Sequence, residues 1–172
     1  MNTIKDIDIS KKKVFIRVDF NVPLDSTQQI TDDARIEAVL PTLKYALSRE
    51  ACVILASHLG RPEGQVKTEF SLQPVARRLG EILGIKVMMA PDCIGEDVAA
   101  LAGDMEGGQV LMLENLRFHK AETQNDSDFG KSLAALCDVY INDAFAVSHR
   151  ANASVVSITQ HAPISAAGLL LK

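Results

Sequence analysis

The amino-acid sequence predicts an α/β protein, a three-layer α/β/α sandwich with a mainly parallel, doubly wound sheet. Short β-branched apolar runs alternate with longer segments in which apolar residues recur every three or four positions, the pattern of βαβ units. The runs are nearly continuous in their apolar residues, as in strands covered on both faces, and the connections are long enough to require parallel pairing with right-handed crossovers. The expected strands are residues 14–18, 52–56, 86–89, 110–113 and 139–141.

The first crossover, residues 32–50, is predicted to be an amphipathic helix with its cap among residues 31–33. Pro41 lies inside it and lacks a backbone donor. We therefore expect either a kink or a second helical segment that begins at Pro41. The apolar face of this helix comprises Ile36, Leu40, Leu43 and Leu47.

The second crossover is expected to begin at Ser71 as its cap, to tolerate Pro74 in its first turn and to end near Gly84. The third crossover helix, residues 95–101, is short, and the fourth covers residues 127–136. Residues 151–158 and the apolar stretch 166–171 receive no firm assignment.

Residues 1–172 are predicted to form a single domain, because no repeat or linker divides them. The chain has 18 Lys and Arg against 22 Asp and Glu, a net charge of −4, and 47% hydrophobic residues. A net acidic chain without a long basic run is unsuited to nucleic acid or to an anionic membrane surface. It also lacks a signal-peptide pattern and a membrane-length apolar run, so a cytoplasmic protein is expected.

Three cysteines, Cys52, Cys93 and Cys137, lie in separate apolar segments. This pattern favours small buried side chains in a reducing compartment, with a reactive thiol as the alternative. No Cys/His group has the spacing of a zinc site, and no bound metal is expected. His119 and His161 lie away from the strand ends and are expected at the surface.

Candidate functional residues follow the carboxyl ends of four expected strands, where ligands bind in open parallel sheets. Every basic residue there is Arg or His, although the chain has more lysines than arginines. The planar fork of Arg grips phosphate or carboxylate oxygens in pairs. We therefore expect a small phosphorylated, carboxylated ligand. The candidates are Arg17, Asp19, Asn21, His58, Arg61, Arg117 and Arg150, with Arg35 near the same rim.

Each candidate also has a structural alternative. Arg17 could pair with Asp19 or Asp143, Arg61 could be a solvated loop residue, and His58 and His149 could be satisfied loop histidines. The sequence lacks a phosphate-binding P-loop and a dinucleotide glycine motif. No nucleotide-binding loop is therefore expected in this chain.

Five motifs together resemble the amino-terminal half of phosphoglycerate kinase, over about residues 11–172. They are VFIRVDFNVPL, DDARI, ASHLGRP, LENLRF and NDAF followed by HR. The resemblance implies a site for 3-phosphoglycerate or 1,3-bisphosphoglycerate. It places Arg35 at the transferred phosphoryl group as the catalytic residue. Asn152 stands where relatives often have histidine. The substrate-binding residues it implies are Asp19, Asn21, Arg35, His58, Arg61, Arg117 and Arg150, and Arg17 is expected to join them.

The nucleotide-binding half of that family is absent from this sequence, which stops after an apolar stretch as if cut from a longer chain. The resemblance therefore implies that Mg-ATP or Mg-ADP binds to a missing carboxy-terminal domain. The chain alone is expected to be a monomer that binds the acid substrate without turnover. Arg-rich positioning without a general acid or base suits phosphoryl transfer between an acyl phosphate and ADP.

Two other functions remain open at this point. The first is an aspartyl-phosphate phosphatase-like hydrolase, with Asp19 as nucleophile and Asp143 as a metal ligand. The second is a stand-alone module that binds a phosphorylated metabolite.

Overall fold

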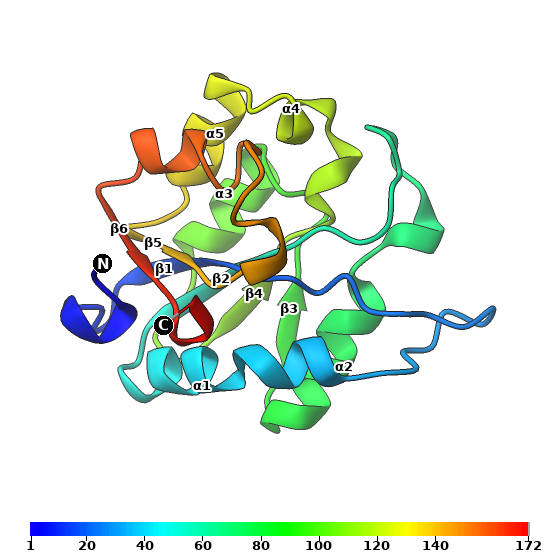
Figure 1. The fold of residues 1–172 in the computed structure, drawn as a ribbon. Helices are drawn as coiled ribbons and strands as arrows, with labels where there is room; N and C mark the ends of the chain where they lie inside the picture. The colour runs from blue at the N-terminus through cyan, green and yellow to red at the C-terminus, as the bar shows by residue number, and fades with distance from the viewer. Residues whose placement is uncertain (172) are drawn as a thin grey trace.

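The computed structural model, which describes residues 1–171, contains one six-stranded sheet in which every strand pair is parallel (Figure 1). The strand order is β3-β4-β2-β1-β5-β6, and helices cover both faces. The predicted three-layer α/β/α class is therefore confirmed. The strands are β1 (Lys13–Arg17), β2 (Cys52–Ala56), β3 (Val87–Met89), β4 (Val110–Met112), β5 (Val139–Asn142) and β6 (Ile164–Ala167).

The two outer layers follow from the direction in which the chain crosses the sheet. From β1 the chain moves outward to β2 and β3 through α1 (Ala34–Ser48) and α2 (Gln73–Leu83). It then returns to β4 and β5 through α3 (Glu96–Gly103), α4 (Lys120–Thr123) and α5 (Ser127–Ala134). Because crossovers are right-handed, reversing the direction moves the helices to the opposite face.

Side-chain alternation along the strands divides the core between these layers. Val14 and Ile16 of β1 pack in one apolar cluster with α1 and α2, whereas Phe15 packs in the other with α3 and α5. Both clusters are fully buried at the central strands. The helices are thereby held rigidly around the carboxyl ends of the strands.

The first helix begins as predicted, with its cap position at Asp33. The structure excludes one of the two alternatives at Pro41. The helix runs without a break through Pro41, so a separate segment beginning at that residue is wrong. Asp33 occupies the cap position without a capping bond, because its carboxylate accepts hydrogen bonds from Arg78 at 3.0 and 2.7 Å. Asp32 instead accepts the Ala34 amide at 2.8 Å.

The second helix begins two residues later than Ser71, whose Oγ accepts the Gln73 amide at 3.2 Å. It ends as predicted at Gly84, which adopts the left-handed conformation with φ 69°. The remaining short elements are 3₁₀ helices η1 (Ile4–Asp6), η2 (Thr68–Phe70), η3 (Leu116–Phe118), η4 (Phe145–Val147), η5 (Ser157–Gln160) and η6 (Leu169–Leu171).

All three cysteines are free and buried, which confirms the expected placement. Burial raises the pKa of each thiol, to about 12 at Cys137. Among residues 1–171, no helix combines the length and the apolar character that a membrane crossing requires.

Candidate functional site

The carboxyl ends of β1, β2, β4 and β5 meet at one edge of the sheet. The loops after β1 and β2 lead to helices on one face, and those after β4 and β5 lead to the other. A crevice opens where neighbouring connections diverge in this way. It holds a cavity of about 250 Å³, and seven of the eight predicted site residues line it. Its lining comprises Asp19, Asn21, Arg35, His58, Gly60, Arg61, Arg117, Ala146, Val147 and Arg150.

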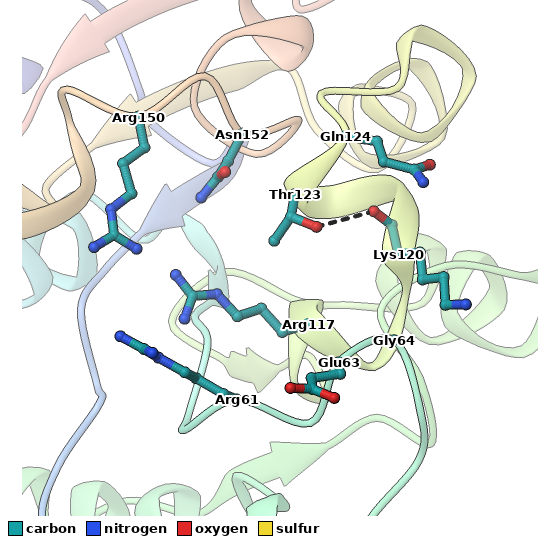
Figure 2. A pocket seen from close by; sticks show the side chains of 9 residues that line it. All are labelled: Arg61, Glu63, Gly64, Arg117, Lys120, Thr123, Gln124, Arg150 and Asn152. Carbon is teal, nitrogen blue, oxygen red and sulfur yellow. Dashed lines mark hydrogen bonds between the residues drawn. The ribbon is translucent and has the colours of Figure 1, made fainter.

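A second cavity of about 580 Å³ adjoins the first and shares Arg61, Arg117 and Arg150 with it. Figure 2 shows these three side chains, which come from different loops, pointing into the same space. The other residues that line this cavity are Glu63, Gly64, Lys120, Thr123, Gln124 and Asn152.

The three shared arginines have few protein partners. Within residues 1–171, the side chains of Arg61 and Arg150 make no hydrogen bond or ion pair. The Arg117 side chain donates one hydrogen bond, from Nη1 to the Gly60 carbonyl at 3.3 Å, and its buried Nε has no partner among these residues. Burial and the neighbouring guanidiniums lower the pKa of Arg117. Clustered guanidiniums with unused donors are suited to an anion.

Asp19 and Arg35 form an ion pair at the opposite side of the smaller cavity. Arg35 Nη1 lies 2.9 Å from both carboxylate oxygens of Asp19. Asp19 also accepts the Asn21 amide at 3.0 Å, and the Asn21 side-chain oxygen accepts the Gly60 amide at 2.8 Å. These bonds leave the Asn21 side-chain NH₂ free to donate to a ligand.

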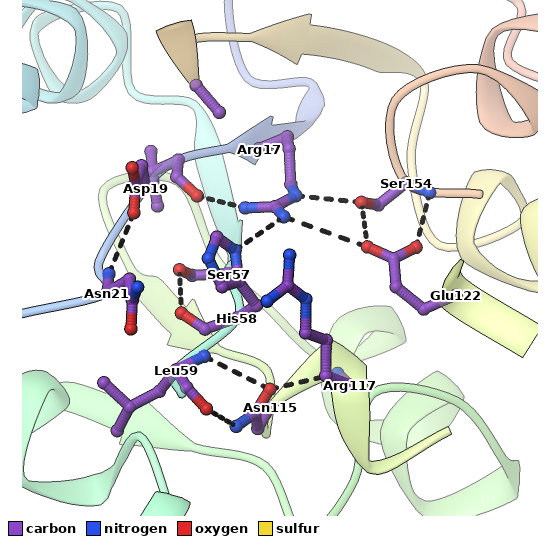
Figure 3. A network of polar contacts seen from close by, with 12 residues as sticks. Arg17, Asp19, Asn21, Ser57, His58, Leu59, Asn115, Arg117, Glu122 and Ser154 are labelled. Carbon is purple, nitrogen blue, oxygen red and sulfur yellow. Dashed lines mark hydrogen bonds and ion pairs between the residues drawn. The ribbon is translucent and has the colours of Figure 1, made fainter. Parts of the chain in front are cut away.

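His58 is neutral and is oriented by Arg17 (Figure 3). Its Nδ1 lies 3.0 Å from Nη2 of Arg17, which can only donate, so Nδ1 accepts and Nε2 carries the proton. Burial, followed by the charge of Arg17 and the other arginines, lowers the pKa of His58 to about 2. His58 therefore presents an N–H donor to the cavity without adding a charge.

Arg17 requires a correction to its predicted role as a substrate anchor. Its side chain is fully buried and lines neither cavity. It donates to Ser154 Oγ at 2.8 Å and to the Val18 carbonyl, and it lies 3.8 Å from the Glu122 carboxylate. Neither Asp19 nor Asp143 forms an ion pair with it. Arg17 instead supports the floor of the site through His58 (Figure 3).

Sequence reasoning missed several residues that hold this floor. Glu122 is fully buried and accepts both the amide and the hydroxyl of Ser154, at 2.8 and 2.5 Å. The Asn115 side chain accepts the Leu59 amide at Oδ1 (3.3 Å) and donates from Nδ2 to the Leu59 carbonyl (2.7 Å) (Figure 3). Asn115 follows the carboxyl end of β4, so it could have been found among the residues that follow the predicted strands. Nothing in the local pattern connects Glu122 with Ser154, 32 residues apart.

The loop after β5 places the side chains of two consecutive residues, His149 and Arg150, in different cavities. Arg150 reaches both basic cavities, whereas His149 packs edge-on against Phe145 and lines a different cavity. Asn152 is 5% exposed, and its buried Nδ2 has no hydrogen-bond partner. Because Asn152 lines the larger cavity, this unused donor is available to a ligand there.

The residues of the smaller cavity do not fit a magnesium ion. Mg²⁺ requires oxygen ligands, usually including a carboxylate. Asp19 is the only carboxylate in the lining described, and Arg35 engages both of its oxygens. The surrounding guanidiniums repel a cation. This edge of the sheet is therefore better suited to an anion than to a cation.

Comparison with known proteins agrees with this geometry. A family model described as phosphoglycerate kinase matches residues 4–172. The chain is 58% identical over 165 residues to phosphoglycerate kinase from Geotalea uraniireducens, covering 96% of this chain and 41% of that relative. It is 54% identical over 172 residues to cytosolic phosphoglycerate kinase from Triticum aestivum, covering 100% and 43%.

Solved structures give the same result. Phosphoglycerate kinase from Coxiella burnetii matches with a TM-score of 0.88 and 40% identity, over 98% of this chain and 42% of that one. The Pyrococcus horikoshii enzyme matches with a TM-score of 0.89 and 32% identity, over 99% and 43%. The chain thus spans about two fifths of the length of these relatives. Because the family model covers nearly the whole sequence, the chain belongs to the phosphoglycerate kinase family.

Proposed function

We propose that this chain is the acid-binding half of a phosphoglycerate kinase. It binds 3-phosphoglycerate and 1,3-bisphosphoglycerate during reversible, glycolytic transfer of a phosphoryl group to ADP. The observation that carries the proposal is the cluster of Arg61, Arg117 and Arg150, which has almost no protein partners and adjoins neutral hydrogen-bonding groups in a cavity of about 250 Å³. In a phosphorylated hydroxy acid, the charge would match the arginine cluster and the polar groups would match the neutral hydrogen-bonding groups.

Each part of the cavity has a distinct task in this proposal. The three arginines neutralise and orient the phosphate end of the ligand. Asn21 and His58 donate hydrogen bonds, and Asp19 accepts one from a ligand hydroxyl. Such positioning accounts for most of the catalysis in phosphoryl transfer, which requires little covalent chemistry from the protein.

Arg35 is the proposed catalytic residue. Its side chain lines the cavity, is paired with Asp19 through Nη1 and is half exposed, so its other nitrogens remain available to a ligand. Charge spreads over the oxygens of the phosphoryl group in the transition state. A guanidinium at this position would stabilise that charge more strongly than the charge of the ground state.

The nucleotide belongs to the rest of the parent protein in this proposal. Residues 1–171 offer a cationic cavity that does not fit magnesium, and the sequence carries no phosphate-binding P-loop. Mg-ATP or Mg-ADP would supply the phosphoryl donor or acceptor from the other domain. The scattered free cysteines and the named cytosolic wheat relative support a cytoplasmic location.

The phosphatase alternative finds no support in the geometry. It needs a free Asp19 carboxylate and a metal held with the help of Asp143. Asp19 is paired with Arg35, and Asp143 is fully buried, with its Oδ1 accepting the Leu170 amide at 2.9 Å.

Calorimetric titration of the 172-residue chain tests the proposal. We expect saturable binding of 3-phosphoglycerate that weakens as salt is added, because the contacts are ionic. ATP at the same concentration should give no comparable heat. Tight ATP binding, or no response to millimolar 3-phosphoglycerate at low salt, would remove the assignment.

A further inference from the structure

A group of three potential metal ligands lies outside the basic cavities. Asp92 and Cys93 belong to the loop between β3 and α3, and His119 follows η3. One ligand atom from each of these side chains lies within 4.8 Å of the other two. None of the three lines either basic cavity. The sequence spacing concealed this group because Cys93 and His119 lie 26 positions apart.

The immediate surroundings hold the group in position. His119 Nε2 lies 2.7 Å from Asp92 Oδ1, and the same oxygen accepts the Cys93 amide at 2.7 Å. The Asp92 carbonyl accepts the Glu114 amide at 3.3 Å. The imidazole of His119 packs on Phe129 of α5, with ring centroids 5.3 Å apart.

The group is accessible from solvent on one side only. The side chains of Asp92 and His119 are 45% and 30% exposed, whereas Cys93 is fully buried among apolar residues. An ion could therefore enter past the carboxylate and the imidazole and meet the thiol from outside. The apolar side would exclude other ligands.

The donor types define the class of ion. Thiolate, imidazole and carboxylate are the three common zinc ligands, and three protein ligands leave a fourth tetrahedral position for water. A sulfur ligand disfavours Mg²⁺ and Ca²⁺, which prefer all-oxygen sites. We propose that Asp92, Cys93 and His119 form a binding site for Zn²⁺ or a similar divalent transition-metal ion.

Binding would exchange the internal hydrogen bond for three metal bonds. The Cys93 S–H bond breaks, its proton passes to solvent, and the sulfur electron pair forms the bond to the metal. His119 contributes its Nε2 lone pair as its ring proton moves to Nδ1, and an Asp92 oxygen completes the protein ligands. No electron is transferred.

Titration of the full chain with Co²⁺ alone tests the proposal, because a cobalt–thiolate bond absorbs in the near ultraviolet. We expect this absorption to saturate at one equivalent and to disappear on addition of Zn²⁺. Because the ion would join the β3–α3 loop to the segment after η3, Zn²⁺ should also raise the thermal unfolding temperature.

Matched variants assign the signal to the three residues. Cys93→Ser should abolish the near-ultraviolet band, and His119→Gln should weaken binding about tenfold or more. Cys137→Ser and His161→Gln, which change the same residue types elsewhere, should behave like the unaltered chain. His119 is partly exposed, so His119→Gln remains informative if Cys93→Ser fails to fold. A missing band in the unaltered chain, a band that survives Cys93→Ser, or an unchanged Co²⁺ affinity in His119→Gln would overturn the proposal.

Discussion

The neutral state of His58 predicts a pH dependence of stability. Its pKa is about 2 in the folded protein, against about 6.5 in the unfolded chain. Between these values the unfolded chain binds a proton that the native state excludes, so stability falls as pH falls below 6.5. His58 alone should cost about 2 kcal/mol between neutral pH and pH 5.

Urea unfolding at several pH values between 7 and 5 measures this effect. His58→Gln should flatten the decline, whereas His161→Gln, an exposed histidine, should leave it unchanged. Equal slopes for the His58→Gln chain and the unaltered chain would show that His58 takes up its proton as readily in the native state as in the unfolded chain, which would contradict the lowered pKa.

Arg61 and Arg150 provide a second test at the scale of single residues. Neither side chain has a hydrogen-bond or ion-pair partner among residues 1–171, so its replacement would remove the proposed ligand contacts without breaking an internal bond in this range. Charge-assisted hydrogen bonds contribute about 1.5 to 3 kcal/mol each. Arg61→Ala or Arg150→Ala should therefore weaken 3-phosphoglycerate binding about tenfold or more, measured by calorimetry.

Substitution by Lys at either position should restore only part of the affinity, because an ammonium lacks the planar fork. Arg77→Ala is the matched control, since it removes the same charge from an exposed position on α2. An affinity that stays the same in Arg61→Ala or Arg150→Ala would show that this arginine makes no contact with the ligand.

The expectation that ligands bind at the carboxyl ends of the strands identified most of the residues that line the smaller cavity. It could not distinguish residues that line the cavity from residues that support it from behind. Arg61 and Arg17 both occur at strand ends, yet one is exposed to the cavity and the other is fully buried. The difference depends on Glu122 and Ser154, which reach Arg17 from distant parts of the chain. Only the tertiary structure supplies that information.

At the scale of elements, Gly168 lets the end of β6 approach the loop after β5. A Cβ added at Gly168 would lie 2.2 to 2.6 Å from atoms of the buried Asp143 side chain. Gly168→Ala must therefore displace Asp143 and weaken its bond to the Leu170 amide. We expect a loss of about 1 to 3 kcal/mol in the free energy of unfolding.

Gly103→Ala is the control for this change, because a Cβ at Gly103 has open space and lies at the end of α3. It should leave stability unchanged or raise it slightly. Chemical denaturation of both variants makes the comparison. A Gly168→Ala protein as stable as the Gly103→Ala protein would show that β6 and the β5 loop are not tightly packed.

The elements with a clear pattern of apolar residues were predicted from the sequence, whereas short elements with a weak pattern were not. The five apolar runs each became a strand of the sheet. Strand β6 (Ile-Ser-Ala-Ala) was missed because three of its four residues are small and only the last is buried. Its pairing with β5, rather than an apolar pattern, defines it as a strand. Helix α4 has only four residues, too few to show a period.

At the scale of the whole molecule, the reversal of the crossovers gathers the groups that we propose for one ligand at a single edge of the sheet. Residues after β1, β2, β4 and β5, together with Arg35 of α1, contribute the proposed acid-binding groups from both sides of the crevice. In-line phosphoryl transfer requires a second substrate within bond-forming reach. The remaining three fifths of the relatives' length is where we place that second site.

This division predicts that the 172-residue chain binds 3-phosphoglycerate but turns over nothing, while its full-length parent is a kinase. In that parent, Arg35→Ala should lower kcat much more than it raises KM for phosphoglycerate. The reason is that an interaction formed mainly in the transition state is expressed in the rate rather than in ground-state binding. Asp19 would be left without its partner, so unfolding measurements on the variant must accompany the kinetics. A coupled assay of both proteins decides the matter: turnover by the 172-residue chain, or a full-length Arg35→Ala enzyme altered only in KM, would contradict the assignment of Arg35 and of this half of the protein.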